Sequence, residues 1–338
     1  MIKNLWNDEE SKAFENDDLA LRVYTSRLLG ADDTLVLHGG GNTSVKIKEK
    51  NLFGEEEKIL YVKGSGWDLR SIEKKGFAPV KMDVLLKMAA LEELSDTDMV
   101  LNQKSAMKNP NAPTPSVEAI LHAIIPFKYV DHTHTDAVVT LSNTPNGEKI
   151  IREIYGDELL IIPYVMPGFI LAKKIYKYTI GLNWSSYRGM VLLNHGLFTF
   201  SDIAKESYEN MIELVSKAEQ YIYENKANPI LAESTKECDL LRIAEIRKEI
   251  STQKGSATIA YFEDSPLSFT IATQENLNMT QRGPLTPDHV IRTKAKPAII
   301  GEDFKNDIVS FIEDYKRYFE KHKKNETMLN PAPNFAIL

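Results

Sequence analysis

Residues 129–141, with the sequence YVDHTHTDAVVTL, decide how the rest of the chain is interpreted. The segment is rich in β-branched and apolar residues, and the turn-forming sequence NTPNG follows it, so a strand is predicted. Side chains alternate along a strand, which places His132 and His134 on the same face. Two neighbouring imidazoles on a rigid element favour a zinc-type metal site, whereas the simpler alternative is a pair of polar residues on a solvated strand.

The composition is that of a soluble globular protein with room for one large or two ordinary domains. The chain has 338 residues, of which 43% are hydrophobic and 26% charged, and its net charge of −7 argues against a nucleic-acid-binding surface. The N-terminal residues lack the pattern of a secretory signal, and no apolar run approaches the roughly 20 residues of a membrane span. Because Cys238 is the single cysteine, no internal disulfide is possible, and a reducing, cytoplasmic location is expected.

Two glycine-rich turns follow predicted strands near the N-terminus. The first, HGGGNTSVK at 38–46, follows a predicted strand at 34–37, and the second, KGSGW at 63–67, follows one at 59–62. Glycines let the backbone turn tightly and present N–H groups, and Asn, Thr and Ser add side-chain donors, so the two turns can face one anion. The first turn fits neither the P-loop nor the dinucleotide fingerprint, and a plain hairpin turn is the alternative for it.

Two further segments carry candidate site residues. Ser116 is predicted to cap a helix with Val117 on its apolar face, Glu118 in its first turn and His122 four residues further on. A solvated carboxylate favoured by the helix dipole is the simpler explanation of Glu118, and His122 is only a reserve metal ligand. His195 follows a predicted buried strand at 190–193, where it either completes a facial triad or caps the strand end.

Hydrophobic periodicity and turn signals predict the remaining elements. Helices are predicted over 14–29, 83–94, 147–156, 168–177, 202–226, 235–250 and 303–322. Strands are predicted over 159–163, 257–262 and 267–272, and a loop over 283–294. The Asn228-Pro229 pair is a candidate domain boundary.

Five motifs, in this order along the chain, resemble the class II aldolase/adducin family: GNTS (41–44), GSG (64–66), PSVE (115–118), HTH (132–134) and NHG (194–196). The resemblance covers roughly residues 15–226. DHTH (131–134) and TPDHVIRTK (286–294) are also similar to the aldolase part of bifunctional rhamnulose-1-phosphate aldolase/dehydrogenase proteins, which continue into a dehydrogenase domain. The resemblance implies an α/β fold, a three-layer α/β/α sandwich with a central, mostly antiparallel sheet over 1–226, followed by an α+β extension over 227–338.

The resemblance also implies the site. A divalent metal, usually zinc, would be held by His132, His134 and His195, with Glu118 as the acid/base. The substrate phosphate would be held by Asn42, Thr43, Ser44, Ser65 and Gly66, with Ser116 beside them. Many family members have a second serine where this chain has Val117, so one hydroxyl of the phosphate site is missing. In the extension, His289 and Arg292, next to Asp288, are candidates to donate a proton or bind the sugar, and a structural turn is the alternative.

The implied reaction is retro-aldol cleavage of a ketose 1-phosphate of the rhamnulose 1-phosphate type to dihydroxyacetone phosphate and an aldehyde. A metal that chelates the ketose oxygens and a nearby carboxylate suit that chemistry. The alternatives are an epimerase, dehydratase or decarboxylase of the same fold, and a non-catalytic adducin-like interaction domain. A metallo-β-lactamase fold is disfavoured because Ala137 replaces the last histidine of its motif. A homotetramer with a sugar phosphate substrate is expected, with a separate dehydrogenase as a candidate partner and no membrane partner.

Overall fold

The computed structural model describes residues 1–225, 231, 239–323 and 326–338, and the chain divides into two units. Unit 1 is Met1–Lys226 and unit 2 is Ala227–Leu338. The predicted boundary at Asn228-Pro229 lies outside the described residues. No helix in the described ranges combines the length and the apolar character that crossing a membrane requires.

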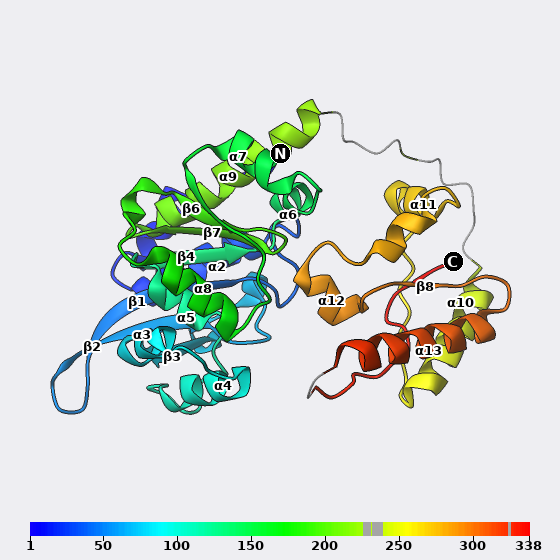
Figure 1. Ribbon diagram of the computed structural model, residues 1–338, viewed down its shortest axis with the longest axis horizontal. Helices are drawn as coiled ribbons and strands as arrows, with labels where there is room; N and C mark the ends of the chain where they lie inside the picture. Colours follow the sequence, from blue (N-terminus) through cyan, green and yellow to red (C-terminus); the bar gives the residue numbers. More distant parts are fainter. Residues whose placement is uncertain (226–230, 232–238, 324–325) are drawn as a thin grey trace. The chain divides into compact units, whose positions relative to one another are not determined.

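Unit 1 is built on one seven-stranded sheet with the order β3-β2-β1-β4-β7-β6-β5 (Figure 1). Every neighbouring pair is antiparallel except β5 and β6, which are parallel. The strands are β1 (Asn42–Lys50), β2 (Glu56–Lys63), β3 (Phe77–Lys81), β4 (Tyr129–Thr133), β5 (Leu159–Ile162), β6 (Gly189–Leu192) and β7 (Gly196–Ser201). The mostly antiparallel central sheet is therefore confirmed.

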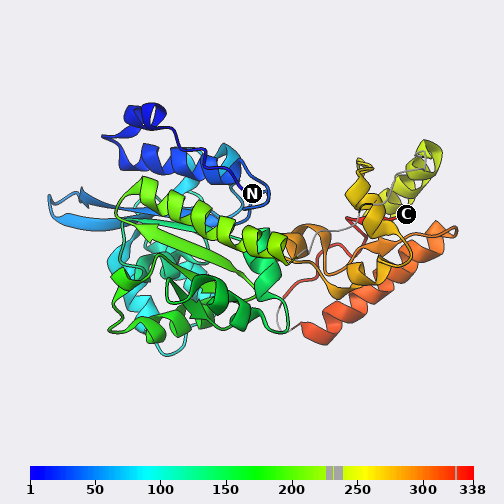
Figure 2. The same ribbon diagram turned by 90° about the horizontal axis from the view of Figure 1, so that it is seen from above.

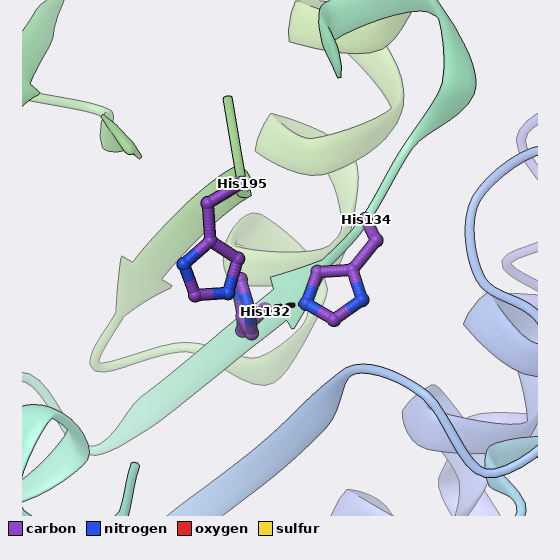
Figure 3. Close-up of side chains that lie close together, drawn as sticks. All are labelled: His132, His134 and His195. Atoms are coloured by element: carbon purple, nitrogen blue, oxygen red, sulfur yellow. Dashed lines mark hydrogen bonds between the residues drawn. The ribbon is translucent and has the colours of Figure 1, made fainter. Parts of the chain in front are cut away.

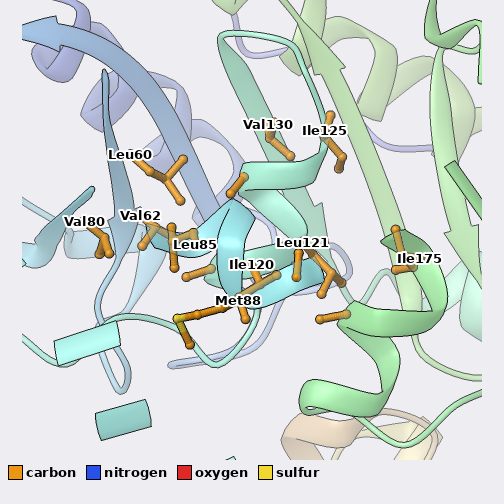
Figure 4. Close-up of a cluster of buried hydrophobic side chains, with 14 of the residues drawn as sticks. Leu60, Val62, Val80, Leu85, Met88, Ile120, Leu121, Ile125, Val130 and Ile175 are labelled. Carbon is orange, nitrogen blue, oxygen red and sulfur yellow. The ribbon is translucent and has the colours of Figure 1, made fainter. Parts of the chain in front are cut away.

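Helices cover both faces of the sheet, as Figures 1 and 2 show. On one face lie α3 (Met82–Ala90), α4 (Asp96–Ser105), α5 (Ala119–Ile124) and α8 (Phe169–Thr179), and their apolar side chains meet those of the central strands in the cluster of Figure 4. On the other lie α2 (Asp18–Gly30), α6 (Asp136–Ser142), α7 (Gly147–Tyr155) and α9 (Ala204–Glu224), which enclose a second buried cluster. Short α1 (Asp8–Ser11) precedes α2. The 3-10 turns are η1 (Lys12–Phe14), η2 (Leu69–Ser71), η3 (Lys74–Gly76) and η4 (Trp184–Ser186). The three-layer prediction is confirmed.

The strand predicted over 129–141 is wrong in its second half. Strand β4 ends at Thr133, and 136–142 form helix α6. The neighbouring strands set this end. The pairing of β4 with β1 stops at His132, opposite Asn42, and its pairing with β7 stops at Thr133, opposite Leu197. Without partner strands the β-branched residues bury themselves on a helix instead. The strand predicted over 34–37 is also wrong, since 34–35 form a turn and 36–37 are irregular.

The helix that follows Pro115 begins later than predicted. Helix α5 starts at Ala119, so Glu118 and not Ser116 occupies the N-cap position. The Ser116 hydroxyl accepts a hydrogen bond from the Glu118 N–H at 3.3 Å, which tightens the turn before the helix. Val117 is 40% exposed and does not join the apolar face. Ser116, Val117 and Glu118 therefore form a turn in front of the helix.

Unit 2 contains four helices and a two-stranded parallel sheet within its described ranges. They are α10 (Leu240–Lys254), α11 (Pro266–Ala272), α12 (Pro287–Thr293), α13 (Phe304–His322), β8 (Ala298–Ile299) and β9 (Ala336–Ile337), together with η5 (Leu277–Arg282). The strands predicted over 257–262 and 267–272 are wrong, and α12 occupies part of the predicted loop. For α11 the cause is capping: the Ser265 hydroxyl accepts from the Ser268 N–H, and Pro266 opens the helix.

Candidate metal centre and active site

Three histidines converge at one end of the central strands (Figure 3). His132 lies near the end of β4, His134 follows that strand, and His195 lies in the turn between β6 and β7. One ring nitrogen of each lies within 4.8 Å of the others, and the Nε2 atoms of His132 and His134 are 3.0 Å apart. All three side chains are 9% exposed or less. The cluster therefore offers three buried nitrogen ligands from two neighbouring segments.

The environment of His132 holds it in the form that binds a metal. Its Nδ1 atom donates a hydrogen bond to the Leu197 carbonyl at 3.1 Å, so Nε2 carries the lone pair and faces the cluster. Burial, reinforced by His134 and His195, lowers the pKa of His132 well below its usual value. Three imidazoles match the donor set of catalytic zinc sites, which leave a coordination position open. The residues present thus fit a divalent metal.

The backbone around His195 needs two unusual residues. Asn194 adopts a left-handed conformation with φ of 59°, and its side-chain amide donates to the Ser142 carbonyl. Gly196 lies against β4: a Cβ atom there would be 2.4 Å from the Thr133 carbonyl oxygen and 2.9 Å from Cε1 of His132. The Asn-His-Gly sequence is therefore what allows His195 to reach the other two histidines.

Glu118 places its carboxylate beside this cluster. One oxygen lies 3.4 Å from Nε2 of His132 and the other 3.4 Å from Nε2 of His195. The side chain is 5% exposed, and its Oε2 atom accepts a hydrogen bond of 2.7 Å from the Asn42 amide. A buried carboxylate next to three histidines can bind a proton close to a metal-held substrate. The solvated-carboxylate explanation of Glu118 is wrong.

The predicted phosphate residues separate into two groups. Ser65 and Gly66 form an exposed turn that lies beside 113–116, since the Ser65 N–H donates to the Thr114 carbonyl and the Ser116 N–H to that of Lys63. Gly66 has φ of 80°, and a Cβ atom at this position would have no neighbouring atom within 4 Å. The turn therefore lies beside Ser116, whose hydroxyl accepts the hydrogen bond from the Glu118 N–H.

The three residues after Gly41 behave differently. Asn42 hydrogen-bonds both Glu118 and, at 3.1 Å, the Ser116 hydroxyl. Thr43 points to the opposite face of β1, fully buried, and its hydroxyl bonds that of Ser26 at 2.8 Å. Ser44 is also fully buried and bonds His122. The structure therefore brings Asn42 to the site and leaves Thr43 and Ser44 within the protein interior.

Two contacts of the site were missed by sequence reasoning. His122 is fully buried and has both ring nitrogens in hydrogen bonds, to Ser44 and Asn42, so it does not join the metal cluster. Its spacing of four residues from Glu118 gives no sign of these partners, because both lie on β1. Lys63 is 2% exposed, donates to the Gly39 carbonyl at 3.0 Å, and joins the two glycine-rich turns.

His289 and Arg292 lie on helix α12 of unit 2. Nδ1 of His289 lies 2.8 Å from the Thr286 hydroxyl, and the Arg292 carbonyl accepts a bond of 2.8 Å from Asn334. Asp288 is buried, at 6% exposed. These contacts order the short helix around the TPDH sequence.

Comparisons with known proteins find matches to both units of the chain. Residues 20–222 match the family described as "Class II Aldolase and Adducin N-terminal domain", and 239–338 match "Aldolase class II, second domain". The N-terminal class II aldolase domain of a conserved Thermoplasma acidophilum protein is 40% identical, with a TM-score of 0.60 over 66% of this chain and 100% of that one. A sugar-phosphate aldolase from Thermotoga maritima is 15% identical, with a TM-score of 0.46 over 63% of this chain and 97% of that one.

A longer relative is also known. The Bacillus subtilis (strain 168) protein described as "Uncharacterized oxidoreductase YuxG" is 30% identical over 362 residues. That similarity covers 100% of this chain and 52% of the relative. The chain thus spans about half the length of this curated relative.

Proposed function

This chain belongs to the class II aldolase and adducin family, and from that premise we propose that it is a metal-dependent aldolase. The proposed reaction cleaves a ketose 1-phosphate of the rhamnulose 1-phosphate type to dihydroxyacetone phosphate and an aldehyde. The observation that carries the proposal is the buried Glu118 carboxylate, 3.4 Å from two of three converging histidines. An interaction domain without catalysis has no need for such a costly buried group.

His132, His134 and His195 would hold the metal, for which zinc is the candidate that suits three imidazoles. When bound, a divalent cation supplies Lewis-acid stabilisation of the negative charge that develops on the ketose oxygens. The protein supplies the arrangement around it. His132 is fixed by its bond to the Leu197 carbonyl, and the turn at Asn194 fixes His195.

Glu118 would perform the proton transfer. Its carboxylate takes the proton from the hydroxyl on carbon 4 of the ketose, and the bond between carbons 3 and 4 breaks. Carbon 4 becomes the carbonyl of the released aldehyde. The electron pair of the broken bond stays with the three-carbon half, which receives on carbon 3 the proton that Glu118 holds and leaves as dihydroxyacetone phosphate. The hydrogen bond from Asn42 holds the carboxylate during this step.

The phosphate would bind at the turn containing Ser65 and Gly66, next to Ser116, with Asn42 behind it. Binding energy at this end positions the reacting bond at the other. Val117 is exposed, and many members of the family that the chain resembles have a serine hydroxyl at this position. An unphosphorylated ketose is therefore the second candidate substrate, and the same site supports a sibling reaction such as epimerisation.

The test is to incubate purified protein with a panel of ketose 1-phosphates and the free ketoses, and to measure dihydroxyacetone phosphate or dihydroxyacetone. Chelated and zinc-restored samples run in parallel. Metal-dependent release supports the aldolase and ranks the substrates. No release from metal-loaded protein rejects the aldolase and favours a sibling reaction.

Two variants assign the roles. We expect Glu118→Gln to keep one metal per chain and to lose at least about a hundredfold in turnover, since general acid–base catalysis contributes that much. We expect His195→Ala to lose both metal and activity, while His322→Ala, at an exposed histidine of unit 2, retains both. Full activity of Glu118→Gln removes Glu118 from the mechanism, and tight stoichiometric metal in His195→Ala assigns the third ligand elsewhere.

The larger assembly follows from the same premise. We propose a cytoplasmic homotetramer, as the family resemblance implies. We also propose that the aldehyde product passes to a dehydrogenase, because the longer relative carries the description oxidoreductase. Light scattering measures the assembly. Reduction of a nicotinamide cofactor by a coupled aldehyde dehydrogenase measures the product.

A further inference from the structure

We propose that His122 and Ser44 are positioning residues that orient the Glu118 carboxylate through the side-chain amide of Asn42. The proposal rests on the proposed role of Glu118. The evidence is a continuous chain of side-chain hydrogen bonds from Ser44 to His122, from His122 to Asn42, and from Asn42 to Glu118. None of these contacts involves the histidines of the metal cluster as donor or acceptor.

The direction of every bond in this chain is fixed by chemistry. An ionised carboxylate only accepts hydrogen bonds, so Nδ2 of Asn42 donates to Glu118 at 2.7 Å. This leaves Oδ1 of Asn42 facing Nε2 of His122, and an amide oxygen only accepts, so Nε2 carries the proton. Nδ1 of His122 is then an acceptor and receives the Ser44 hydroxyl hydrogen at 2.8 Å. Each donor thus sets the orientation of the next group.

The chain lies in the interior, where water does not compete for these bonds. His122 and Ser44 are fully buried, and Asn42 is 5% exposed. Burial lowers the pKa of His122 well below its usual value, which keeps the ring neutral. The ring also packs edge-on against Phe198, at 5.5 Å between centroids. Buried networks of hydrogen-bonded side chains rigidify the groups that they connect.

Strand register links the chain to the metal cluster. Asn42 lies directly opposite His132 in the pairing of β1 with β4, and Ser44 lies opposite Val130. Asn42 also donates to the Ser116 hydroxyl, which belongs to the turn beside the proposed phosphate site. One amide therefore fixes the carboxylate relative to both the metal ligands and the phosphate end.

Four variants test this assignment in the zinc-loaded protein with both units present. His122→Leu removes the donor to Asn42, whereas His122→Gln retains a donor. We expect His122→Leu to lower kcat about 10- to 100-fold with KM and metal stoichiometry nearly unchanged, and His122→Gln to recover most of the loss. We expect a smaller loss for Ser44→Ala. The matched control is Ser26→Ala, a buried serine that bonds Thr43 on the opposite face of β1.

A double variant separates positioning from general structural damage. If His122 acts through Glu118, His122→Leu added to Glu118→Gln costs no further activity. Independent, multiplicative losses in the double variant would overturn the proposal, as would equal losses in His122→Leu and His122→Gln. Urea unfolding of each variant shows whether folding is retained.

A third readout does not depend on activity. Nitrogen-15 NMR of the wild-type histidine rings is expected to show His122 protonated at Nε2 and bare at Nδ1, both with and without zinc. The opposite tautomer rejects the hydrogen-bond chain even in a fully active enzyme. If the wild type releases no dihydroxyacetone phosphate, the aldolase proposal fails while the tautomer still decides the positioning chain.

Discussion

At the scale of single residues, Gly196 is where one methyl group would disturb the histidine cluster directly. A Cβ atom there would lie 2.4 Å from the Thr133 carbonyl oxygen and 3.1 Å from Cδ2 of His134. We expect Gly196→Ala to lower the free energy of unfolding by about 1–3 kcal/mol and to weaken zinc binding. Urea unfolding and competitive zinc titration measure these effects. The control is Gly301→Ala, whose nearest contact would be an ordinary 3.5 Å; equal effects at both positions contradict the argument.

Lys46 gives the stability of the protein a pH dependence. Burial, with a smaller contribution from Lys58, lowers the pKa of Lys46 to about 7, and its Nζ atom donates to the Phe127 carbonyl at 2.6 Å. Between pH 7 and the unfolded pKa of 10.5, the unfolded chain binds a proton that the folded chain has released. Stability from this group therefore rises with pH across that window, by at most about 1.4 kcal/mol per pH unit.

We expect Lys46→Met to remove this contribution. The gain in the free energy of unfolding between pH 7.5 and 9.5 should be smaller in Lys46→Met than in the wild type, as measured by urea unfolding at both values. Lys48→Met, an exposed lysine of the same strand, serves as the control and should keep the wild-type difference. An unchanged gain in Lys46→Met would show that the group stays charged.

The sequence motifs located the histidines and Glu118, because each lies in a short stretch whose chemistry is independent of distant residues. The roles of Thr43 and His122 could not be found in this way. Thr43 faces Ser26 because of the alternation along β1, and His122 reaches Asn42 only because β1 pairs with β4 beside α5. Such contacts depend on register and packing across the sheet, which local residue patterns leave open.

At the scale of secondary structure elements, a buried ion pair connects α2, β4 and α9. Nη2 of Arg22 lies 2.5 Å from Oδ1 of Asp131, both side chains are fully buried, and the Ser207 hydroxyl donates to the other carboxylate oxygen. We expect Asp131→Asn to cost about 3–5 kcal/mol, because it leaves the Arg22 charge buried without its partner. Urea unfolding measures the loss.

The double variant Arg22→Met/Asp131→Asn is the control for this prediction. It removes the uncompensated charge and should be more stable than Asp131→Asn alone. Asp131 and His132 point to opposite faces of β4, so folded Asp131→Asn should still bind zinc. A loss below about 1 kcal/mol would show that water or another group compensates Arg22.

The elements that the sequence predicted well have strong periodicity or a continuous apolar run. Helix α9 and strand β6 are of this kind, and both closely match the predicted ranges. Residues 136–142 and 266–272 also have strand-like composition but form helices. In the first case the sheet offers no partner strand, and in the second a serine cap and a proline set the helix start. Tertiary context and capping outweighed β-propensity at both places.

At the scale of the whole molecule, each unit has its own buried core. Unit 1 contains two large clusters on the faces of its sheet, and unit 2 contains one around Ile246, Ile308 and Ile312. All three candidate metal ligands and Glu118 belong to unit 1. We therefore propose residues 1–226 as a catalytic domain and 227–338 as an extension with its own fold.

This division predicts the behaviour of a truncated protein. We expect residues 1–226 to unfold cooperatively and to bind one zinc per chain with the affinity of the full chain, because no ligand is removed. Circular dichroism during urea unfolding and a zinc titration measure both properties. His195→Ala in the same truncated chain should abolish zinc binding. A truncated chain that is unfolded, or folded without zinc binding, would show that unit 2 is needed to build the centre.

The same truncation, compared with point variants of the full chain, measures what unit 2 adds to turnover. If His289 or Arg292 acts on the substrate, the truncated protein keeps its zinc but loses turnover, and His289→Ala or Arg292→Ala reproduces that loss in the full chain. Lys321→Ala, at an exposed position of α13, is the control that keeps full turnover. Full turnover in both point variants, together with a loss on truncation, would assign unit 2 a structural part instead. The His289 ring, held by Thr286, would then serve only to order α12.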